Sequence, residues 1–233
     1  MAVDDSYTKL LLHMDGADNG ITFTDEAGKT ITPGNQSCTK TGIKKFGTAS
    51  AYFDGAFDYL LTPLVADLQF GTEDFTIDCW TYLLSRASYY PCLFSNLANW
   101  TTGSIGLFIG HNAASNKYRV YIDSASVLLT STNNIIYNEW AHIALVRSGN
   151  DYKLYINGTN DGSGSSTSAI NGNGSNFFIS ASGDIGSHSS LYGYVDEFRV
   201  SKGIARWTTN FTPPTSPYGP PTIDKRLILA TFI

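Results

Sequence analysis

Residues 140–158, WAHIALVRSGNDYKLYING, decide the fold. Side chains alternate in character with a period of two in both halves of this stretch, most clearly in the run YKLYI. Such alternation is typical of β-strands, because successive side chains leave a strand on opposite faces. Residues 148–151, Ser-Gly-Asn-Asp, join the halves and predict an antiparallel hairpin. Residues 157–158, Asn-Gly, tolerate positive φ angles, so we expect a second tight turn after the hairpin.

The composition also favours strands. Of the 233 residues, 42% are hydrophobic and only 15% are charged. That is enough apolar material for a sizeable core, and helices usually carry more Lys, Glu and Arg on their exposed faces. The net charge is −5 without a Lys/Arg run, and no stretch is long and apolar enough to span a membrane. We therefore expect neither a nucleic-acid partner nor membrane insertion, and no attraction to an anionic membrane surface.

The pattern predicts one domain at residues 1–218 and an apolar tail at 219–233. About a dozen short strands, with no internal repeat and no linker before residue 211, are typical of an all-β fold, a two-sheet antiparallel jelly-roll β-sandwich. Besides the hairpin, strands are expected at residues 7–13, 49–53, 59–61, 74–83, 92–95, 105–111, 118–123, 126–130, 177–181 and 192–201.

Connections between these strands can be predicted in part. We expect residues 49–53 and 59–61 to pair as a second hairpin around DGAFD. One helical turn is expected at residues 65–68 and a single turn at 203–207. Residues 159–175 are rich in Gly and Ser, which favours a loop.

The N-terminus lacks the features of a secretory signal. In MAVDDSYTKLLLH an acidic pair stands where a signal has Lys or Arg, and the apolar run is too short. Cys38, Cys79 and Cys92 are odd in number and have no metal-ligand spacing. We interpret Cys79 as a small buried hydrophobe, because it lies inside an apolar strand. The sequence thus predicts synthesis in a cytosol without export by a secretory signal.

Four runs stand in an order that resembles one family: LLLHMDGADN…FTDEAGKT, FGTASAYFDGAFDYL, DFTIDCWTYL and NEWAHIALVRSGNDYKLYING…GYVDEFRVSKGIARW. Across residues 7–218 the chain resembles the concanavalin A-like lectin/glucanase superfamily, in particular its laminin-G-like jelly rolls. It looks most like the versions found in bacteriophage virion proteins, where FDG near the start and DEFRVS near the end recur. The resemblance implies the two-sheet fold. Function stays open, because relatives include lectins, adhesion modules, glucanases and capsid or tail appendages.

Glycoside hydrolysis needs two carboxylates that flank the scissile bond. The superfamily's glucanases place them at alternate positions of one strand, as in Glu-x-Asp-x-x-Glu, and no such run occurs here. Glu73-Asp74 and Asp78 lie on or beside a central strand, and Asp78 has no carboxylate two residues away. Asp196 and Glu197 are adjacent, so regular alternation would place them on opposite faces. We expect no catalytic residues and no enzymatic activity.

Relatives often hold a structural Ca²⁺ near the chain ends, and hard cations prefer several oxygen ligands. The resemblance implies Asp15, Asp25 and Asp196 as candidate ligands, and structural Ca²⁺ is the one cofactor that it suggests. Asp25 lies in FTDEAGKT, which resembles the family's Asp-Ser-Ser-Gly turn although Glu and Ala replace the two serines. The alternative is that these acids cap turns and pair with Arg199 or Lys29.

Lectin sites combine an aromatic ring, stacked on the sugar, with nearby amides or carboxylates. We predict Tyr89, Tyr90, Asn96, Asn99 and Trp100 as glycan contacts on loops, and the alternative is that these loops only cover the sheet. A second predicted platform is the outward face of the central strands, and it contains Asp78, Trp80, Tyr82, Arg119, Tyr121 and Tyr155.

These observations predict a non-enzymatic virion protein, a phage head or tail appendage whose lectin-like domain contacts a host-surface polysaccharide or neighbouring virion subunits. We expect a homo-oligomer. The tail, RLILATFI, is predicted either to dock on its own sandwich or to pair with another chain. Two alternatives stay open: an architectural capsid decoration protein without sugar binding, and a polysaccharide-active enzyme.

Overall fold

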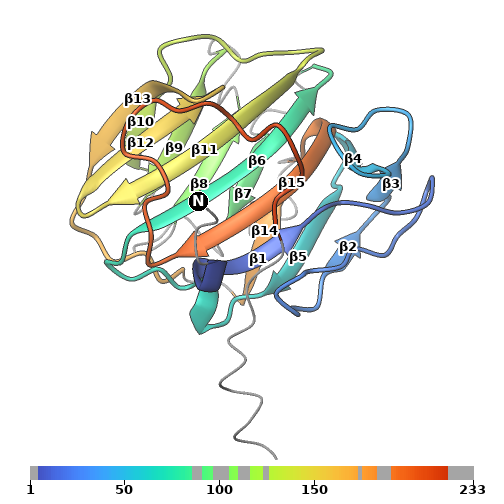
Figure 1. The fold of residues 1–233 in the computed structure, drawn as a ribbon, viewed down its shortest axis with the longest axis horizontal. Coiled ribbons are helices and arrows are strands. Elements are labelled where there is room, and N and C mark those ends of the chain that lie inside the picture. Colours follow the sequence, from blue (N-terminus) through green and yellow to red (C-terminus); the bar gives the residue numbers. More distant parts are fainter. Residues whose placement is uncertain are drawn as a thin grey trace, which may run out of the picture.

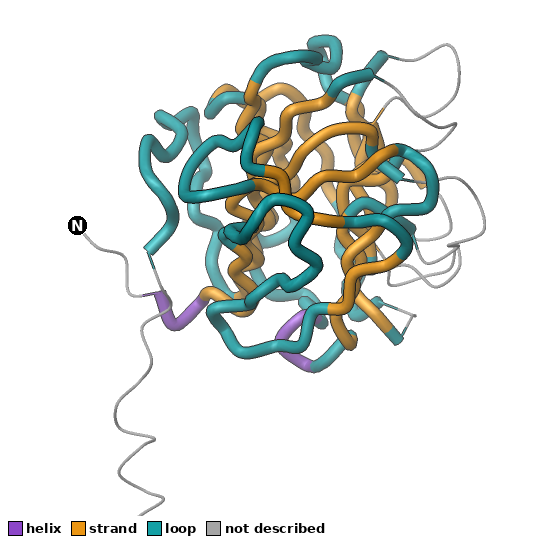
Figure 2. The backbone as a smooth tube through the Cα atoms, turned by 90° about the vertical axis from the view of Figure 1, so that its right-hand side faces the viewer, coloured by secondary structure: helices purple, strands orange, loops and turns teal. Residues whose placement is uncertain are grey.

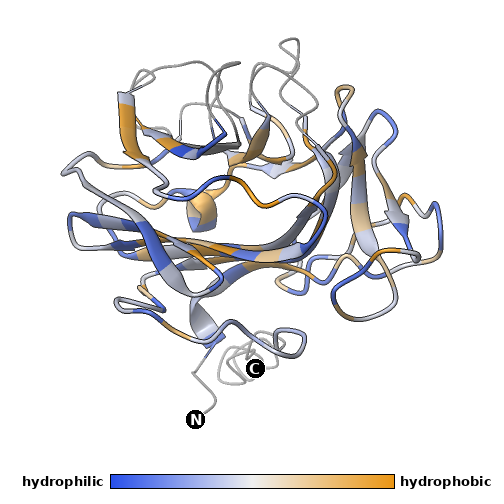
Figure 3. Cartoon of the chain, turned by 90° about the horizontal axis from the view of Figure 1, so that it is seen from above, coloured by the Kyte–Doolittle hydropathy of each residue, from blue (hydrophilic) through white to orange (hydrophobic). Residues whose placement is uncertain are grey.

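The computed structural model describes residues 5–85, 91–96, 105–109, 116–122, 126–172, 175–182 and 190–219. Within them the chain is almost entirely strand and loop, and its helical content is two short 3₁₀ turns, η1 (Asp5–Tyr7) and η2 (Ala66–Leu68) (Figure 2). Two β-sheets form separate layers when the molecule is seen from above (Figure 3). No helix in the described part of the chain has the length and apolar character needed to cross a membrane.

The larger sheet has eight strands in the order β13-β12-β11-β6-β15-β4-β3, and β1 also pairs with β15 (Figure 1). Its members are β1 (Thr8–Leu12), β3 (Cys38–Lys40), β4 (Ser50–Asp54), β6 (Phe75–Leu83), β11 (Trp140–Ser148), β12 (Asp151–Ile156), β13 (Thr159–Ser165) and β15 (Tyr192–Lys202). All of its pairings are antiparallel.

The smaller sheet has seven strands in the order β10-β9-β8-β7-β14-β5-β2, again antiparallel throughout. Its members are β2 (Thr32–Gly34), β5 (Tyr59–Pro63), β7 (Cys92–Ser95), β8 (Ile105–Ile109), β9 (Tyr118–Ile122), β10 (Ser126–Thr130) and β14 (Asn176–Ile179). The predicted all-β, two-sheet antiparallel jelly roll is confirmed.

The hairpin predicted from residues 140–158 is present, with Leu145 of β11 opposite Leu154 of β12. Asn157 and Gly158 follow with φ angles of 50° and 76°, so the second predicted turn also forms. β6, the predicted central strand, pairs with β11 on one side and with β15 on the other.

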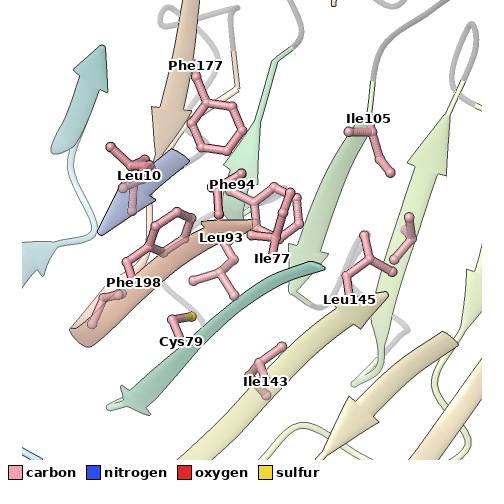
Figure 4. Packing of buried hydrophobic residues seen from close by; sticks show 14 of the residues in the cluster. Leu10, Ile77, Cys79, Leu93, Phe94, Ile105, Ile143, Leu145, Phe177 and Phe198 are labelled. Atoms are coloured by element: carbon pink, nitrogen blue, oxygen red, sulfur yellow. The ribbon is translucent and has the colours of Figure 1, made fainter. Parts of the chain in front are cut away.

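The core lies between the sheets, and strand alternation fills it (Figure 4). Ile77 and Cys79 of β6 point into it together with Leu145 of β11. From the smaller sheet, Phe94 and Phe177 stack with ring centroids 6.2 Å apart. Each fully buried side chain of this size contributes roughly 1.5–3 kcal/mol relative to an exposed one. Cys79 is buried, as its apolar strand predicted.

The hairpin predicted for residues 49–61 does not form. β4 belongs to the larger sheet and β5 to the smaller one, so the segment between them carries the chain from one layer to the other. The buried carboxylate of Asp58 shapes this crossing by accepting hydrogen bonds from the backbone N–H groups of Asp54 and Gln36, both at 2.8 Å. Period-two alternation identifies strands but not the sheet to which each belongs, and this explains the error.

The predicted loop at residues 159–175 is also partly wrong, because its first seven residues form the edge strand β13. Gly162 and Gly164, which suggested a loop, lie against the backbone of β10 in the other sheet. A Cβ atom added to Gly164 would lie 2.3 Å from the carbonyl oxygen of Leu128. Glycine is needed here because the edges of the two sheets approach each other closely.

Substitution of Gly164 by alanine should therefore lower the free energy of unfolding by about 1–3 kcal/mol, because the added methyl group overpacks the junction of the sheets. Urea denaturation followed by fluorescence would measure the change. Ser165→Ala is the matched control, since Ser165 is exposed on the same strand. Equal stability of the two variants would contradict the assignment of this edge contact.

Candidate functional site

A segment that we call the strap, residues 203–219, crosses the outer face of the larger sheet in front of β15, β6, β11 and β12 (Figure 1). Where a single turn was predicted, at residues 203–207, the strap bends at Gly203 and at Arg206. Trp207 and Phe211 of the strap stack at 3.9 Å with nearly parallel rings and pack on His142 and Tyr155. The N–H of Phe211 also donates to the carbonyl of Gly158 at 2.9 Å. The outer face of this sheet is thus largely covered.

A buried charge network lies under the strap. Arg199 of β15 donates two hydrogen bonds to Asp78 of β6, at 3.0 and 2.9 Å. The Arg199 guanidinium also lies 3.9 Å from the ring centroid of Tyr218, whose hydroxyl is 3.0 Å from Nε2 of His142. Burial alone would raise the pKa of Asp78, but Arg199 and His142 outweigh it and hold that pKa well below its usual value. Asp78 is therefore ionised, and its ion pair with Arg199 stabilises the packing of β6 against β15.

Asp196 and Glu197 lie on the same side of β15, contrary to the prediction from alternation. A β-bulge shifts the register between Asp196 and Arg199, and Glu197 has a φ angle of 50°. Asp196 accepts from the N–H groups of Lys45 and Phe46 at 2.7 and 3.1 Å, while Glu197 accepts from the N–H of Tyr218 at 2.8 Å. Burial raises the pKa of Asp196 to about 7, although the Phe46 and Lys45 N–H groups act to lower it. Both carboxylates are held by internal hydrogen bonds.

Glu197 also links the strap to the first strand through His13, whose Nδ1 lies 2.8 Å from the carboxylate. The hydrogen bond with Glu197 raises the pKa of His13 against the effect of burial. A raised pKa means that the pair stabilises the fold fully below about pH 6.5 and loses this contribution as pH rises through the folded-state pKa. We expect wild type to exceed His13→Gln in stability by about 1 kcal/mol at pH 5.5 and by less at pH 8.5. Thermal melts of both proteins across that range would test it, and a constant difference would contradict it.

The three candidate calcium ligands do not form one ligand set. Asp25 is buried and accepts from three backbone N–H groups, those of Leu11, Ala27 and Lys29. Asp15 accepts from the N–H and hydroxyl groups of Thr48. Nowhere in the described ranges do three or more His, Cys, Asp or Glu side chains come together in a way that could hold a metal. The hydrogen bonds of Asp25 and Asp15 are those of turn caps, the alternative that the sequence left open, and a bound Ca²⁺ stays a prediction.

An open hollow of about 470 Å³ lies on the outer face of the larger sheet, beside the strap. We call it the tryptophan hollow, and its lining residues are Lys45, Phe46, Trp80, Trp140, Asn157, Thr212, Pro213, Pro214 and Thr215. Phe46 meets Trp80 edge-on at 6.0 Å, and the ammonium of Lys45 lies 3.9 Å from the Trp80 ring centroid. Trp140 meets Tyr82 edge-on at 5.7 Å. The hollow therefore combines aromatic faces with a cation and an amide.

Of the five predicted glycan contacts, Asn96 is the one that belongs to the described residues. Tyr89, Tyr90, Asn99 and Trp100 lie outside the described residues. Asn96 is fully buried, and its side-chain oxygen accepts from the N–H of Ile105 at 2.8 Å, so it stabilises the end of β7.

The second predicted platform is divided between the two sheets. Arg119 and Tyr121 belong to β9 of the smaller sheet, whereas the other members belong to the larger one. Tyr155 is buried beneath Phe211 of the strap, and Trp80 is 6% exposed. Of this platform, only Trp80 lines the tryptophan hollow.

The sequence indicated that Trp140 lies on the outer face of its strand, but the predicted glycan contacts did not include this residue. Trp140 stands two residues before His142, so period-two alternation places both on the outer face of β11. Lys45 and Phe46 could not be found in this way, because a loop far away in sequence brings them to the hollow. Asn157 was assigned only to a turn, but its side chain also accepts a hydrogen bond from the N–H of His142 at 2.9 Å.

Two packed antiparallel sheets with an open aromatic hollow on one outer face define a lectin-like jelly-roll domain. The chain belongs to the concanavalin A-like lectin/glucanases superfamily, whose laminin-G-type signature matches residues 53–206. No sequence among the curated proteins matches the chain.

Solved structures share this fold at low sequence identity. Domain 4 of an extracellular GH43 arabinanase from Geobacillus stearothermophilus, in complex with arabinotriose, is 16% identical with a TM-score of 0.62, over 85% of this chain and 94% of that one. The binding domain of Paraclostridial mosquitocidal protein 1 is 14% identical with a TM-score of 0.65, over 85% of this chain and 49% of that one. Trypanosoma rangeli sialidase is 17% identical with a TM-score of 0.58, over 82% of this chain and 30% of that one. The chain thus spans nearly all of the arabinanase domain, about half of the toxin binding domain and less than a third of the sialidase.

Proposed function

We propose that this protein is a non-catalytic carbohydrate-binding domain and that it holds its glycan in the tryptophan hollow. The observation that carries the proposal is the convergence of the half-buried rings of Trp140 and Phe46 on one open hollow, which the largely buried Trp80 also lines together with several polar groups. Aromatic faces bind the apolar faces of sugar rings, while a few polar groups fix orientation through the hydroxyls. The complex of the arabinanase domain with arabinotriose is consistent with sugar recognition on this fold.

The residues that line the hollow favour glycan binding over glycan hydrolysis. Its lining residues in the described part of the chain include no Asp or Glu. Asp78, Asp196 and Glu197, the nearby acids of the larger sheet, are each engaged in internal hydrogen bonds. Hydrolysis with either stereochemical outcome needs two carboxylates facing the scissile bond. We therefore expect no release of reducing sugar from laminarin, agar or any glycan that the protein binds.

Replacing Trp140 by alanine should weaken glycan binding at least about 30-fold, the loss typical of a tryptophan at the centre of a binding site. A glycan array would identify a ligand, and isothermal titration would then compare wild type with Trp140→Ala. Tyr90→Ala and Trp100→Ala are the comparison variants, because they test the loops that the sequence suggested. Undiminished binding by Trp140→Ala together with loss in either loop variant would move the site away from the hollow. No binding of any glycan by wild type would overturn the proposed function.

We also propose that the domain acts within a phage particle and contacts a host-surface polysaccharide or a neighbouring virion subunit. The support is in the sequence, in the FDG and DEFRVS runs that resemble phage virion proteins. The apolar tail, residues 219–233, is the candidate anchor, and its residues 220–233 lie outside the described part of the chain. Mass spectrometry of purified virions would test the location. Deletion of residues 222–233 should then abolish incorporation while sparing glycan binding, and a chain missing from virions would refute this proposal.

A further inference from the structure

We propose that the glycan is acidic and that Lys45 binds a carboxylate on one of its sugars in the tryptophan hollow. This inference rests on the proposed function and adds the chemical class of the ligand. It follows from the charge that the hollow presents, the way Lys45 is held and the balance of donors and acceptors among the lining side chains.

Lys45 is a positioned cation without a carboxylate partner. Its backbone N–H is fixed by Asp196 at 2.7 Å, and the neighbouring N–H of Phe46 is fixed by the same oxygen at 3.1 Å. Its ammonium lies over the Trp80 ring at 3.9 Å. None of the ion pairs found among the described residues includes Lys45. The ammonium is therefore held at the wall of the hollow with its charge available to a ligand.

Two further side chains of the hollow have a hydrogen-bond donor without a protein acceptor among the described residues. The side-chain oxygen of Asn157 is occupied by the N–H of His142, which leaves its amide NH₂ group as the free end. The indole N–H of Trp80 is buried without a hydrogen-bond partner. No carboxylate lines the hollow within the described residues. The hydroxyls of Thr212 and Thr215 can both donate and accept, so the charge of this wall is the Lys45 ammonium. A carboxylate is the natural sugar substituent that pairs most strongly with such a cation.

Asp196, the carboxylate that binds the Lys45 backbone N–H, does not fully cancel the charge of the Lys45 ammonium. Both side-chain oxygens of Asp196 accept from backbone N–H groups, and burial raises its pKa to about 7, so it is only partly ionised at neutral pH. Lys44 precedes Lys45 in the same loop, and its side chain is exposed. Lys45 is thus the cation that lines the hollow within the described residues, in a chain whose net charge is −5.

The neighbouring lysines provide a matched control. Lys44 is exposed and precedes Lys45, but it does not line the hollow, and its ammonium donates to the carbonyl of Thr41 at 2.9 Å. Lys45→Met and Lys44→Met change the net charge equally, so any difference between them reports a local contact. Lys45→Arg keeps the charge at the hollow. Near-ultraviolet circular dichroism of each variant would verify that the tryptophan environment persists.

The ligands should differ only in the carboxylate. Acidic oligosaccharides prepared from hyaluronan, alginate and polygalacturonate would be compared with the same oligosaccharides after reduction of their carboxylates to alcohols, by isothermal titration at 50 mM salt. We expect wild type to bind at least one acidic ligand at least tenfold more tightly than its reduced form. Lys45→Met should abolish that preference, whereas Lys44→Met and Lys45→Arg should retain it.

Three outcomes would overturn the inference in distinguishable ways. Equal binding of acidic and reduced ligands, or binding of neutral sugars alone, would reject an acidic ligand and leave the proposed function intact. An equal effect of Lys45→Met and Lys44→Met would reject the direct contact and leave only a general charge effect. No binding of any oligosaccharide, acidic or neutral, would reject the proposed function together with the inference.

Discussion

Replacing Arg199 by methionine is expected to lower the free energy of unfolding by about 3–5 kcal/mol. Arg199 is the main partner of Asp78, whose side chain is fully buried beneath the strap. Removing the guanidinium leaves that carboxylate without its compensating charge in a region from which water is excluded. The pKa of Asp78 should then rise from its lowered value, and the variant should lose the stability that ionised Asp78 now contributes above the unfolded-state pKa.

Urea denaturation at pH 7 would measure this loss, and two further variants would show its cause. Lys202→Met breaks an ion pair with Glu73, whose side chain is 57% exposed, so it should cost less than about 1 kcal/mol. The double variant Asp78→Leu/Arg199→Met removes both charges and should recover much of the stability, because an apolar pair carries no desolvation penalty. If Arg199→Met cost no more than Lys202→Met, the network under the strap would not be a buried ion pair of structural importance.

This network also explains how the strap is held at its end. The Arg199 guanidinium lies against the ring of Tyr218, and Glu197 accepts the N–H of the same residue. Two side chains of β15 thus fix the last part of the strap, while β11 and β12 hold its middle through Trp207 and Phe211. The residues between these two anchors, 212–215, form one wall of the tryptophan hollow. The charge network therefore supports the proposed site without touching its ligand.

Local periodicity predicted most of the fold, because each strand carries its own pattern. The hairpin of β11 and β12 and the inner and outer faces of β6 could be assigned from consecutive residues alone. The pairing of β4 and β5 with different sheets depends on contacts that are distant in sequence, so the short DGAFD connection was misleading. The edge strand β13 was missed because its glycines serve the approach to β10, a reason that composition does not reveal.

The candidate site was less accessible to sequence reasoning. Aromatic residues on loops suggested Tyr89, Tyr90 and Trp100, which lie outside the described residues, whereas the proposed site in the tryptophan hollow is lined by β6, β11 and the strap. Only tertiary structure brings Lys45 to Trp80 across a separation of 35 positions in the chain. The bulge at Glu197 had no sequence signal either, and it reversed the expected orientation of a carboxylate. Sites formed by crossings between elements are therefore harder to predict than the elements themselves.

Substitution of Gly158 by alanine should lower the free energy of unfolding by about 2–4 kcal/mol, through a positive φ angle and a steric clash together. Gly158 has a φ angle of 76°, and a Cβ atom there would lie 1.9 Å from the carbonyl oxygen of Phe211. The strap would have to move away from β12, with loss of the hydrogen bond from Phe211 to Gly158. Glycan binding should fall more than tenfold, because residues 212–215 directly follow this contact and line the hollow.

Gly149 provides the control that separates the effect of the positive φ angle from the effect of the steric clash. It has a φ angle of 60°, but a Cβ atom added there meets nothing within 4 Å, so Gly149→Ala should cost only about 1 kcal/mol and leave glycan binding unchanged. Denaturation and isothermal titration of both variants would compare the same backbone strain with and without the contact to the strap. Equal losses of stability would show that the strap does not depend on this turn. A stability loss in Gly158→Ala with unchanged glycan affinity would show that the hollow does not need the strap as a wall.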